Sequence, residues 1–470
     1  MIFSSTIFLF GFLPIVLIID RLLLRGWSNI WLLLTSLLFF LWSQPKYFWI
    51  ILLSIVVNYF AGIVLKLVHR LWIKKIVLIV AVVINLSMLF FFKYYNFFIQ
   101  TLNSIFSTDI VMEKIVLPIG ISFFTFQGLS YTIDVYRGDV EANINPLEVG
   151  LYVTLFPQLV AGPIVRYVDI KKEIKGRIRA FSNYYEGLQR FIVGLGKKSI
   201  LADSMALIVD SIWSQGVANN TIAVAWLGSI AYTLQIFFDF SGYSDMAIGL
   251  GRMLGFHFKE NFDHPYHEIS ISGFWRKWHI SLSTWFRDYV YIPLGGNRKH
   301  IYINLVCVFL LTGLWHGAAW NYIIWGGYNA IFILLERFFA MSFKMRKHAK
   351  LKKIISHLYM LFVVNIGWIL FRANSVDNAI IYIINMFGFA TEGIPRFSLY
   401  WYLDRWNICI FVISFFICVG AHELIYERII QVIDEWKISL IKNIGLIAIF
   451  LFSILRIVSG TYNPFIYFQF

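Results

Sequence analysis

Uncharged stretches, each about as long as a membrane-spanning helix, divide this sequence along most of its length. A helix crosses the hydrocarbon core of a bilayer with roughly 17–25 mostly apolar residues. Stretches without Asp, Glu, Lys or Arg cover residues 2–19, 26–45, 47–65, 76–92, 115–133, 149–165, 211–238 and 354–371. Charged residues make up only 14% of the chain, against about 25% in ordinary soluble domains. The pattern predicts an all-α, polytopic integral membrane protein.

No linker, low-complexity tract or internal repeat divides the chain into modules. We therefore expect one integral membrane domain over residues 1–470, with about 11–13 membrane helices, some of them re-entrant or broken. The first uncharged stretch has neither a cationic start nor a small-residue cleavage site before Asp20. It is predicted to be a retained span and not a signal peptide.

The net charge of +14 could indicate a nucleic-acid-binding protein, but the positions of the basic residues argue against it. They gather in short loops between apolar stretches, at 66–75, 166–179 and 344–353. Short loops rich in Lys and Arg are typical of the cytoplasmic side of a membrane. The pattern predicts the lipid bilayer as a partner and no nucleic acid.

Neither the cysteines nor the clustered histidines have the spacing of a metal site. Cys307, Cys409 and Cys418 lie in apolar stretches, and their odd number indicates no disulfide framework and no zinc site. The histidines within 257–267 match no metalloprotease-type motif. No metal is therefore predicted.

The loop charges conflict with a simple count of spans. If loops 66–75 and 166–179 are both cytoplasmic, an even number of crossings separates them, yet three uncharged stretches lie between them. One of the three is then re-entrant or broken, at Pro118 or at Pro157 and Pro163; alternatively, the second loop violates the charge rule. Irregular backbone at membrane depth is tolerated where protein buries it or where it lines a watery cavity. The first reading therefore predicts an internal cavity.

His316 lies in the uncharged stretch 301–335. An ionisable side chain at membrane depth is costly, which suggests a function. The stretch is too long for one crossing, so we expect two short helices or a broken one, with His316 near the middle of the first. Asn321, Gly326 and Gly327 mark the expected bends.

The surroundings of His316 in the sequence allow two readings. Gly313 and Gly317 form a small-residue pair that lets a neighbouring helix approach closely, so the imidazole should face a packed interface. Burial favours the neutral form, which a general base needs. The other reading is that a hydrogen bond from His316 only joins two helices.

His279 is the second histidine of interest. With Trp275, Trp278, Leu282 and Phe286 it follows the i, i+3, i+4, i+7 pattern of a helix face. We expect one amphipathic helix here, lying at the membrane interface or lining a vestibule. The alternative is an interfacial aromatic belt that contains the histidine incidentally.

Asp239 and Asp245 follow the uncharged stretch 211–238. Carboxylates at this depth could orient a histidine, or they could form ion pairs with arginine that fix the register of a helix.

Several long motifs occur in an order that resembles one family. They are "SLLFFLWSQPKYFWIILLSIVVNYFAG", "LPIGISFFTFQGLSYTIDVYRG", "FPQLVAGPIVRY", "YTLQIFFDFSGYSDMAIGLGRMLGF", "FWRKWHISLSTWFRDYVYIPLGGNR" and "GLWHGAAWNYIIWGG". Over nearly its whole length, with a motif core at 115–335, the chain resembles the membrane-bound O-acyltransferases, and among them the bacterial alginate O-acetylation proteins. The D-alanyl transfer proteins of teichoic acid modification look less similar, because "YIPLGGNR" is characteristic of the alginate-type branch.

The resemblance implies a fold with a central tunnel, in which His316 matches the principal catalytic histidine and His279 the second one. The substrate-binding candidates around them are Trp278, Trp315, Asp239, Arg276 and Arg287. The implied donor is a cytoplasmic thioester, with acetyl-CoA as the expected compound and no bound cofactor. The implied acceptor is a polysaccharide outside a bacterial cytoplasmic membrane, reached directly or through an extracytoplasmic SGNH-type partner transferase.

A thioester is already activated, so such an enzyme has to position it, generate a nucleophile and stabilise an oxyanion. His316 would deprotonate the acceptor, while His279 could orient the acceptor, bond the oxyanion or relay a proton. Candidates for the donor's phosphates, otherwise surface ion pairs, are Arg276, Lys277, Arg287 and Arg298. The competing hypotheses are D-alanyl transfer to teichoic acid, non-catalytic transport of an acyl group or saccharide, and a structural subunit that holds a transferase at the membrane.

Overall fold

The computed structural model describes residues 2–111, 113, 115–160, 162–342, 349–389, 397–420, 428, 431 and 433–460, and these residues form helices and no strand. Six helices in these ranges are long and apolar enough to cross a membrane: Gly26–Ser43, Pro45–Leu67, Leu71–Phe106, Ile222–Met253, Lys350–Arg372 and Glu435–Val458. The all-α, polytopic expectation is confirmed. The number of about 11–13 membrane helices stays a prediction.

The chain forms two compact units, each built from separate stretches of sequence. The first comprises Met1–Phe191 and Ser244–Glu260, and the second comprises Ile192–Tyr243 and Asn261–Phe470. Helices α10 (Phe181–Gly196) and α12 (Ile222–Met253) contribute residues to both. The single integral domain over 1–470 stays a prediction.

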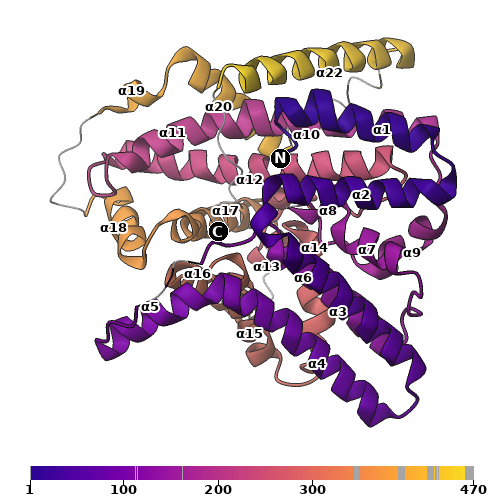
Figure 1. Cartoon of the computed structure of the whole chain (residues 1–470). Helices are drawn as coiled ribbons and strands as arrows, with labels where there is room; N and C mark the ends of the chain where they lie inside the picture. The colour runs from indigo at the N-terminus through magenta and orange to yellow at the C-terminus, as the bar shows by residue number, and fades with distance from the viewer. Residues whose placement is uncertain are drawn as a thin grey trace. The chain divides into compact units, whose positions relative to one another are not determined.

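Buried polar side chains bridge neighbouring helices in the first unit. Its other helices are η1 (Phe8–Phe12), α1 (Leu13–Leu22), α2 (Arg25–Ser43), η2 (Pro45–Tyr47), α3 (Phe48–Leu67), α4 (Leu71–Leu89), η3 (Phe90–Tyr94), α5 (Tyr95–Phe106), α6 (Ile121–Arg137), α7 (Pro146–Thr154), α8 (Phe156–Leu159) and α9 (Tyr167–Gly176). Asn58 of α3 and Asn85 of α4 exchange amide hydrogen bonds of 3.1 and 3.3 Å, and Thr132 of α6 donates to Asn58 Oδ1 at 2.9 Å. Such bonds hold membrane helices together, and α3, α4 and α6 lie side by side (Figure 1).

The uncharged stretch 149–165 is broken, as the loop charges predict. α7 ends at Thr154, Leu155 leaves the helix, and the four residues of α8 follow. The break is wholly buried, since Leu155, Phe156 and Leu159 are each 0% exposed. Protein therefore covers this irregular backbone, which is the condition for tolerating it at membrane depth.

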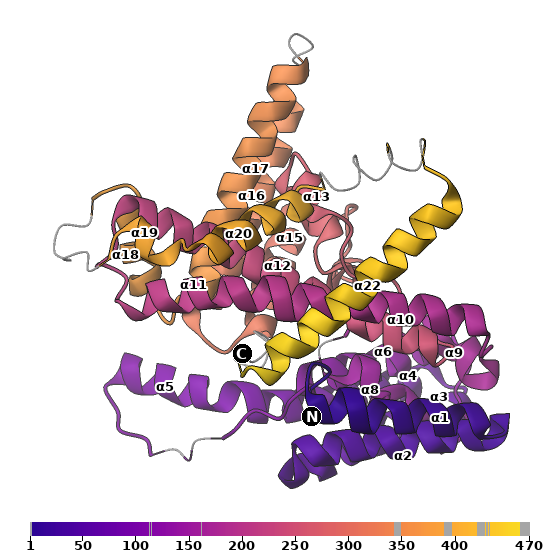
Figure 2. The ribbon, with the colours of Figure 1, turned by 90° about the horizontal axis from the view of Figure 1, so that it is seen from above.

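The second unit brings α15, α16 and α17 together side by side (Figures 1 and 2). Its helices are η4 (Lys197–Ala202), α11 (Asp203–Ser214), η5 (Pro265–His267), α13 (Ile271–Lys277), α14 (Ile280–Phe286), η6 (Arg287–Tyr291), α15 (Ile301–His316), α16 (Trp320–Ser342), α17 (Ala349–Arg372), α18 (Val376–Met386), α19 (Leu399–Tyr402), α20 (Arg405–Cys418) and α22 (Glu435–Val458). A Cβ atom on Gly313 would lie 2.2 Å from the Tyr322 carbonyl oxygen, and one on Gly326 would lie 2.3 Å from that of Phe309. The two glycines therefore let the backbones of α15 and α16 touch.

The bends expected at Asn321, Gly326 and Gly327 are wrong, because all three residues lie inside α16. The chain instead leaves the helix at Gly317, which is extended at φ −163° and ψ 153°, so His316 is the last residue of α15 and not near its middle. Asn321 donates a hydrogen bond of 2.9 Å to the carbonyl of the residue that follows α17, and Gly326 forms the close contact with α15. Glycine here indicates where helices touch and not where they bend.

We expect Gly326→Ala to destabilise the protein, and Gly327→Ala, one residue further on, to leave its stability unchanged or raise it. A methyl group at 326 would overlap a backbone oxygen, whereas at 327 its nearest neighbour is Leu310 Cδ2 at 3.7 Å. Overpacking costs roughly 1–3 kcal/mol, while Ala in place of Gly within a helix gains up to about 1 kcal/mol. Thermal unfolding of the purified variants in detergent measures both effects. Equal stability of the two variants would contradict the close contact between α15 and α16.

Candidate functional site

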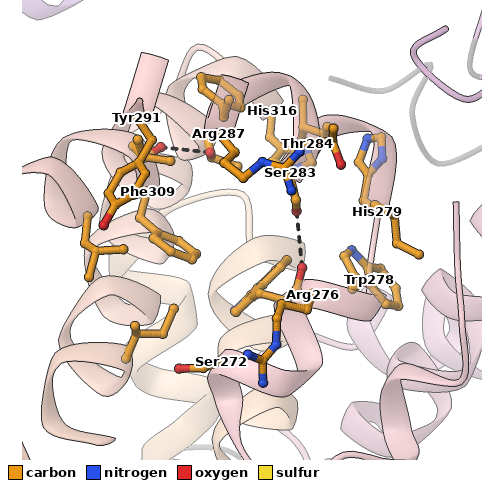
Figure 3. Close-up of a pocket in the computed structure, with 18 of the residues that line it drawn as sticks. Ser272, Arg276, Trp278, His279, Ser283, Thr284, Arg287, Tyr291, Phe309 and His316 are labelled. Carbon is orange, nitrogen blue, oxygen red and sulfur yellow. Dashed lines mark hydrogen bonds between the residues drawn. The ribbon is translucent and has the colours of Figure 1, made fainter. Parts of the chain in front are cut away.

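A cavity of about 490 Å³ in the second unit has both of the selected histidines on its wall. This histidine cavity is bounded by α13, α14, η6, α15 and α16 (Figure 3). The polar and charged side chains that line it are Ser272, Arg276, His279, Ser283, Thr284, Arg287, Tyr291, Thr312, His316 and Arg337. Of the residues selected from the sequence, it brings together His279, His316, Trp278, Arg276 and Arg287.

The continuous amphipathic helix expected around His279 is wrong. α13 ends at Lys277 and α14 begins at Ile280, with His279 between them in left-handed backbone at φ 45° and ψ 55°. The Ile280 N–H donates to the Asn261 carbonyl at 2.9 Å, and the Asp263 N–H donates to the Lys277 carbonyl at 3.1 Å. These bonds satisfy backbone groups that the interruption removes from the helix, as burial requires. Hydrogen bonding to a segment elsewhere in the chain leaves no periodicity in the sequence. The helical pattern around His279 therefore could not reveal the interruption.

Aromatic rings surround His279, which is 2% exposed. The ring of Phe240 meets it edge to face at 4.6 Å between centroids, and that of Trp315 lies 5.8 Å away. Burial lowers the pKa of His279 to about 3, because imidazolium is disfavoured away from water. The side chain is therefore neutral at physiological pH, with one ring nitrogen that can accept a hydrogen bond.

His316 ends α15 within a second aromatic enclosure and is 4% exposed. Trp325 of α16 and Phe371 of α17 meet its ring edge to face at 5.2 and 5.1 Å. The ring of Trp315 lies 5.0 Å from that of His316 and also contacts His279. Trp315 therefore connects the two histidines, although it does not itself line the cavity.

Two polar residues of α16 hold α13 in place, and the sequence analysis missed both. Glu336 accepts hydrogen bonds from the Ser272 N–H at 3.0 Å and from the Ser272 hydroxyl at 2.9 Å. Asn329 Oδ1 accepts one from Trp275 Nε1 at 3.1 Å. Residues two helical turns apart share a face, so a pair of polar side chains on one face of α16 is the signal that could have revealed them.

Three arginines give the cavity a positive charge. Arg276 and Arg287 are expected from the sequence, whereas Arg337 of α16 is a further member of the wall. Arg287 also pairs with Asp288 at 2.7 Å. In the view of Figure 3, Arg276 and Ser272 lie at the end of the cavity away from the two histidines. Arg287 instead lies near His316 and Thr284, so positive charge is present both near the histidines and at the Arg276 end of the cavity.

Three other candidates do not line the cavity: Asp239, Lys277 and Arg298. Asp239 forms an ion pair of 2.7 Å with Lys198, and Lys198 also pairs with Asp203 at 2.8 Å. All three side chains of this cluster are buried, and burial raises the pKa of Asp203 to about 6 although the charge of Lys198 opposes the shift. The ion-pair reading of Asp239 is confirmed, with lysine in place of the expected arginine.

The remaining acidic and histidine candidates lie in other surroundings. Asp245 belongs to the first unit, where Arg190 pairs with it at 2.7 Å. His257 lies 2.8 Å from a carboxylate oxygen of Glu173, and His264 lies 3.2 Å from that of the preceding aspartate. Within the part of the chain that the structure describes, no group of three or more His, Cys, Asp or Glu side chains is arranged to hold a metal ion.

Comparison with known proteins covers the same region. The profile of the membrane-bound O-acyltransferase family matches residues 141–376, which include both histidines. A probable alginate O-acetylase of Pseudomonas putida is 37% identical over 100% of both chains. A peptidoglycan O-acetyltransferase of Helicobacter pylori is 32% identical over 100% of this chain and 98% of its own length. A teichoic acid D-alanyltransferase of Bacillus subtilis is 31% identical over 48% of this chain and 60% of its own length.

Lys198→Met should destabilise the protein by about 3–5 kcal/mol, because it removes the cation that two buried carboxylates share. Lys172→Met, at an exposed position of α9, removes the same formal charge and should change the stability by less than about 0.5 kcal/mol. Thermal unfolding in detergent compares the two variants with the natural protein. If both variants unfold at the same temperature, the cluster around Lys198 does not stabilise the second unit.

Proposed function

Because the chain belongs to the membrane-bound O-acyltransferase family, we propose that it O-acetylates an extracytoplasmic polysaccharide. The donor is a cytoplasmic thioester, acetyl-CoA, and the acetyl group passes through the protein across a bacterial cytoplasmic membrane. The polysaccharide receives it directly or through an extracytoplasmic SGNH-type partner. The observation that carries the proposal is the presence of His279 and His316 on the wall of one cavity.

The choice of acetyl over D-alanyl transfer is supported by the extent of the similarities. The relatives that align over the whole chain are named as acetylating alginate or peptidoglycan. The D-alanyltransferase aligns with about half of it. The two polymers named differ in structure but both offer sugar hydroxyl groups, so a hydroxyl of a polysaccharide is the acceptor class we propose.

The transfer replaces a thioester bond with an ester bond. The acceptor oxygen attacks the thioester carbonyl carbon while His316 takes the hydroxyl proton. The resulting oxyanion collapses, the carbon–sulfur bond breaks, and the departing sulfur receives the proton back from His316. The products are the ester and the free thiol, with the histidine regenerated, and positioning in the cavity supplies much of the rate.

The surroundings of His316 support this role. Trp325 and Phe371 cover its ring, so the reacting groups meet where water has limited access. Exclusion of water strengthens electrostatic interactions and protects a thioester from hydrolysis. Proton transfer by a positioned base raises the rate of a reaction roughly 10²–10⁴-fold.

The arginines on the cavity wall support a phosphorylated donor. Guanidinium groups bind phosphate oxygens through paired hydrogen bonds, and Arg276, Arg287 and Arg337 all reach the cavity. The apolar part of the wall, which includes Val308 and Phe309, suits the uncharged arm between the phosphates and the thioester. With the phosphates of the donor at Arg276, its acetyl group lies toward the two histidines.

His316→Ala should lower acetyl transfer by about 10²–10⁴-fold while leaving the protein folded and inserted. Purified protein, labelled acetyl-CoA and a polysaccharide or partner acceptor give the rate, and release of free thiol confirms the chemistry. His69→Ala, at an exposed loop position, is the matched control and should retain full activity. Undiminished acetyl transfer by His316→Ala would contradict the proposed function. Acetyl movement that needs a gradient and releases no thiol would identify a transporter instead.

Arg276→Gln and Arg337→Gln should each raise KM for acetyl-CoA about tenfold, the equivalent of about 1.4 kcal/mol, because each loses a phosphate contact. The same variants should use S-acetylcysteamine, a thioester without phosphates, as well as the natural protein does. Arg298→Gln is the matched control, since Arg298 is exposed and outside the cavity wall. Equal losses with both donors would show that the arginines act on something other than the donor's phosphates.

A further inference from the structure

The side chain of Asn261 meets three groups at the interruption and at the start of α14, one on His279 and two on Ser281. Its Oδ1 atom lies 3.2 Å from the Ser281 backbone nitrogen, 2.8 Å from the Ser281 hydroxyl and 3.1 Å from His279 Nδ1. Asn261 is 0% exposed and His279 is 2% exposed. The contact is therefore made away from water, where each donor needs an acceptor.

The contact with Ser281 settles which atom of the Asn261 amide faces His279. Oxygen and nitrogen of an amide must be assigned from their hydrogen-bond partners. A backbone N–H can only donate, so the amide atom that it meets is the oxygen. The amide NH₂ at this place would point its hydrogens at the Ser281 N–H.

The identity of that atom fixes the proton on the imidazole. An amide oxygen only accepts hydrogen bonds, so His279 Nδ1 carries the hydrogen and donates it. The Ser281 hydroxyl does not compete for Nδ1, since it lies 3.5 Å from that nitrogen and 2.8 Å from Asn261 Oδ1. In a neutral imidazole the lone pair then belongs to Nε2.

We propose that Asn261 is a positioning residue that holds His279 as the Nδ1–H tautomer, so that Nε2 accepts a hydrogen bond from the acceptor hydroxyl. The role of His279 in this statement rests on the proposed function. A neutral ring with its hydrogen on Nδ1 cannot donate from Nε2. Of the three roles open to His279, bonding the oxyanion is thereby excluded, and orienting the acceptor or relaying a proton is retained.

The surroundings keep the ring uncharged while Asn261 orients it. Phe240 and Trp315 contribute aromatic faces. The acidic residues nearest to Asn261 along the chain are Glu260 and Asp263, and each is paired, Glu260 with Arg190 at 2.6 Å and Asp263 with Lys277 at 3.3 Å. An amide orients imidazole without the charge of a carboxylate, and a carboxylate at this position would favour imidazolium.

The tautomer is measured directly in the natural full-length protein. Nitrogen-15 spectra of histidine-labelled protein distinguish protonated from unprotonated ring nitrogens, and loss of signals in His279→Gln assigns those of His279. We expect a hydrogen on Nδ1 and none on Nε2 between about pH 5 and pH 8. A hydrogen on Nε2 in this range overturns the inference.

Variants of Asn261 test the consequence for catalysis. Asn261→Ala removes the accepting oxygen and should lower kcat about 10–100-fold, as the loss of an orienting partner of a histidine typically does, with KM for acetyl-CoA unchanged. Asn261→Asp keeps the oxygen, so it should fold even if the Ala variant does not. Its negative charge should raise the pKa of His279, so kcat should fall as the pH falls, in a range where the natural protein shows no such loss. An unchanged pH profile in Asn261→Asp overturns the inference.

Ser281→Ala is the matched control. It removes one hydroxyl contact with Asn261 Oδ1 and leaves the backbone contact in place, so the tautomer should not change. The spectrum and the assay also separate this inference from the proposed function. The expected tautomer in a protein that transfers no acetyl group overturns the proposed function alone, and the opposite tautomer in an active enzyme overturns the inference alone.

Discussion

The interruption between α13 and α14 is the feature on which the histidine cavity depends. A left-handed backbone at a residue other than glycine costs roughly 1–3 kcal/mol, so His279 adopts it only because its surroundings compensate for the cost. The backbone and the side chain of Asn261 both do so, through Ile280 and Ser281. In an unbroken helix His279 would be one more member of a periodic face. The interruption instead places its ring between Phe240 and Trp315.

His316 is placed by a different kind of constraint, the contact of two backbones. Gly313 and Gly326 let α15 and α16 approach so closely that a methyl group on either would overlap a carbonyl oxygen. α15 must then end before the chain can turn into α16, and it ends at His316. Both histidines thus lie at helix ends, His279 immediately before α14 and His316 as the last residue of α15. Side chains at such positions are held by backbone geometry as well as by packing.

The features predicted from the sequence are those that depend on composition or on a residue type that is rare in membrane-spanning stretches. Uncharged stretches predicted the helical membrane fold. The two histidines selected from the sequence, His316 in an uncharged stretch and His279 on an amphipathic aromatic one, both lie on the cavity wall. One reading of the loop charges predicted a break in one of three stretches, at Pro118 or at Pro157 and Pro163, and a break lies at Leu155, two residues before Pro157. These signals are local or can be counted, so a single sequence contains them.

Features that depend on pairing between distant segments were missed or wrong. The helical pattern around His279 is genuine, yet a distant segment at Asn261 interrupts the helix. Glu336 and Asn329 of α16 bond to α13. Lys198 of η4 pairs with Asp239 of α12. In each case the partner's identity depends on the fold, and no spacing along the chain records it.

The second unit keeps full charges close to the histidine without charging it. Asp239 is followed in α12 by Phe240, whose ring meets His279, so an ion pair and an uncharged imidazole are supported by adjacent residues. An unpaired charge on Asp239, next to the residue whose ring meets His279, would act strongly on the imidazole in a medium of low dielectric constant. Lys198 lies 2.7 Å from Asp239 and 2.8 Å from Asp203, and the positive charge of Arg456 also acts on Asp203, so the opposite charges of this cluster largely cancel at longer range. Because the charges of this cluster offset one another, the contact at His279 Nδ1 can decide the tautomer. The uncharged amide of Asn261 can then orient the imidazole without making it a cation.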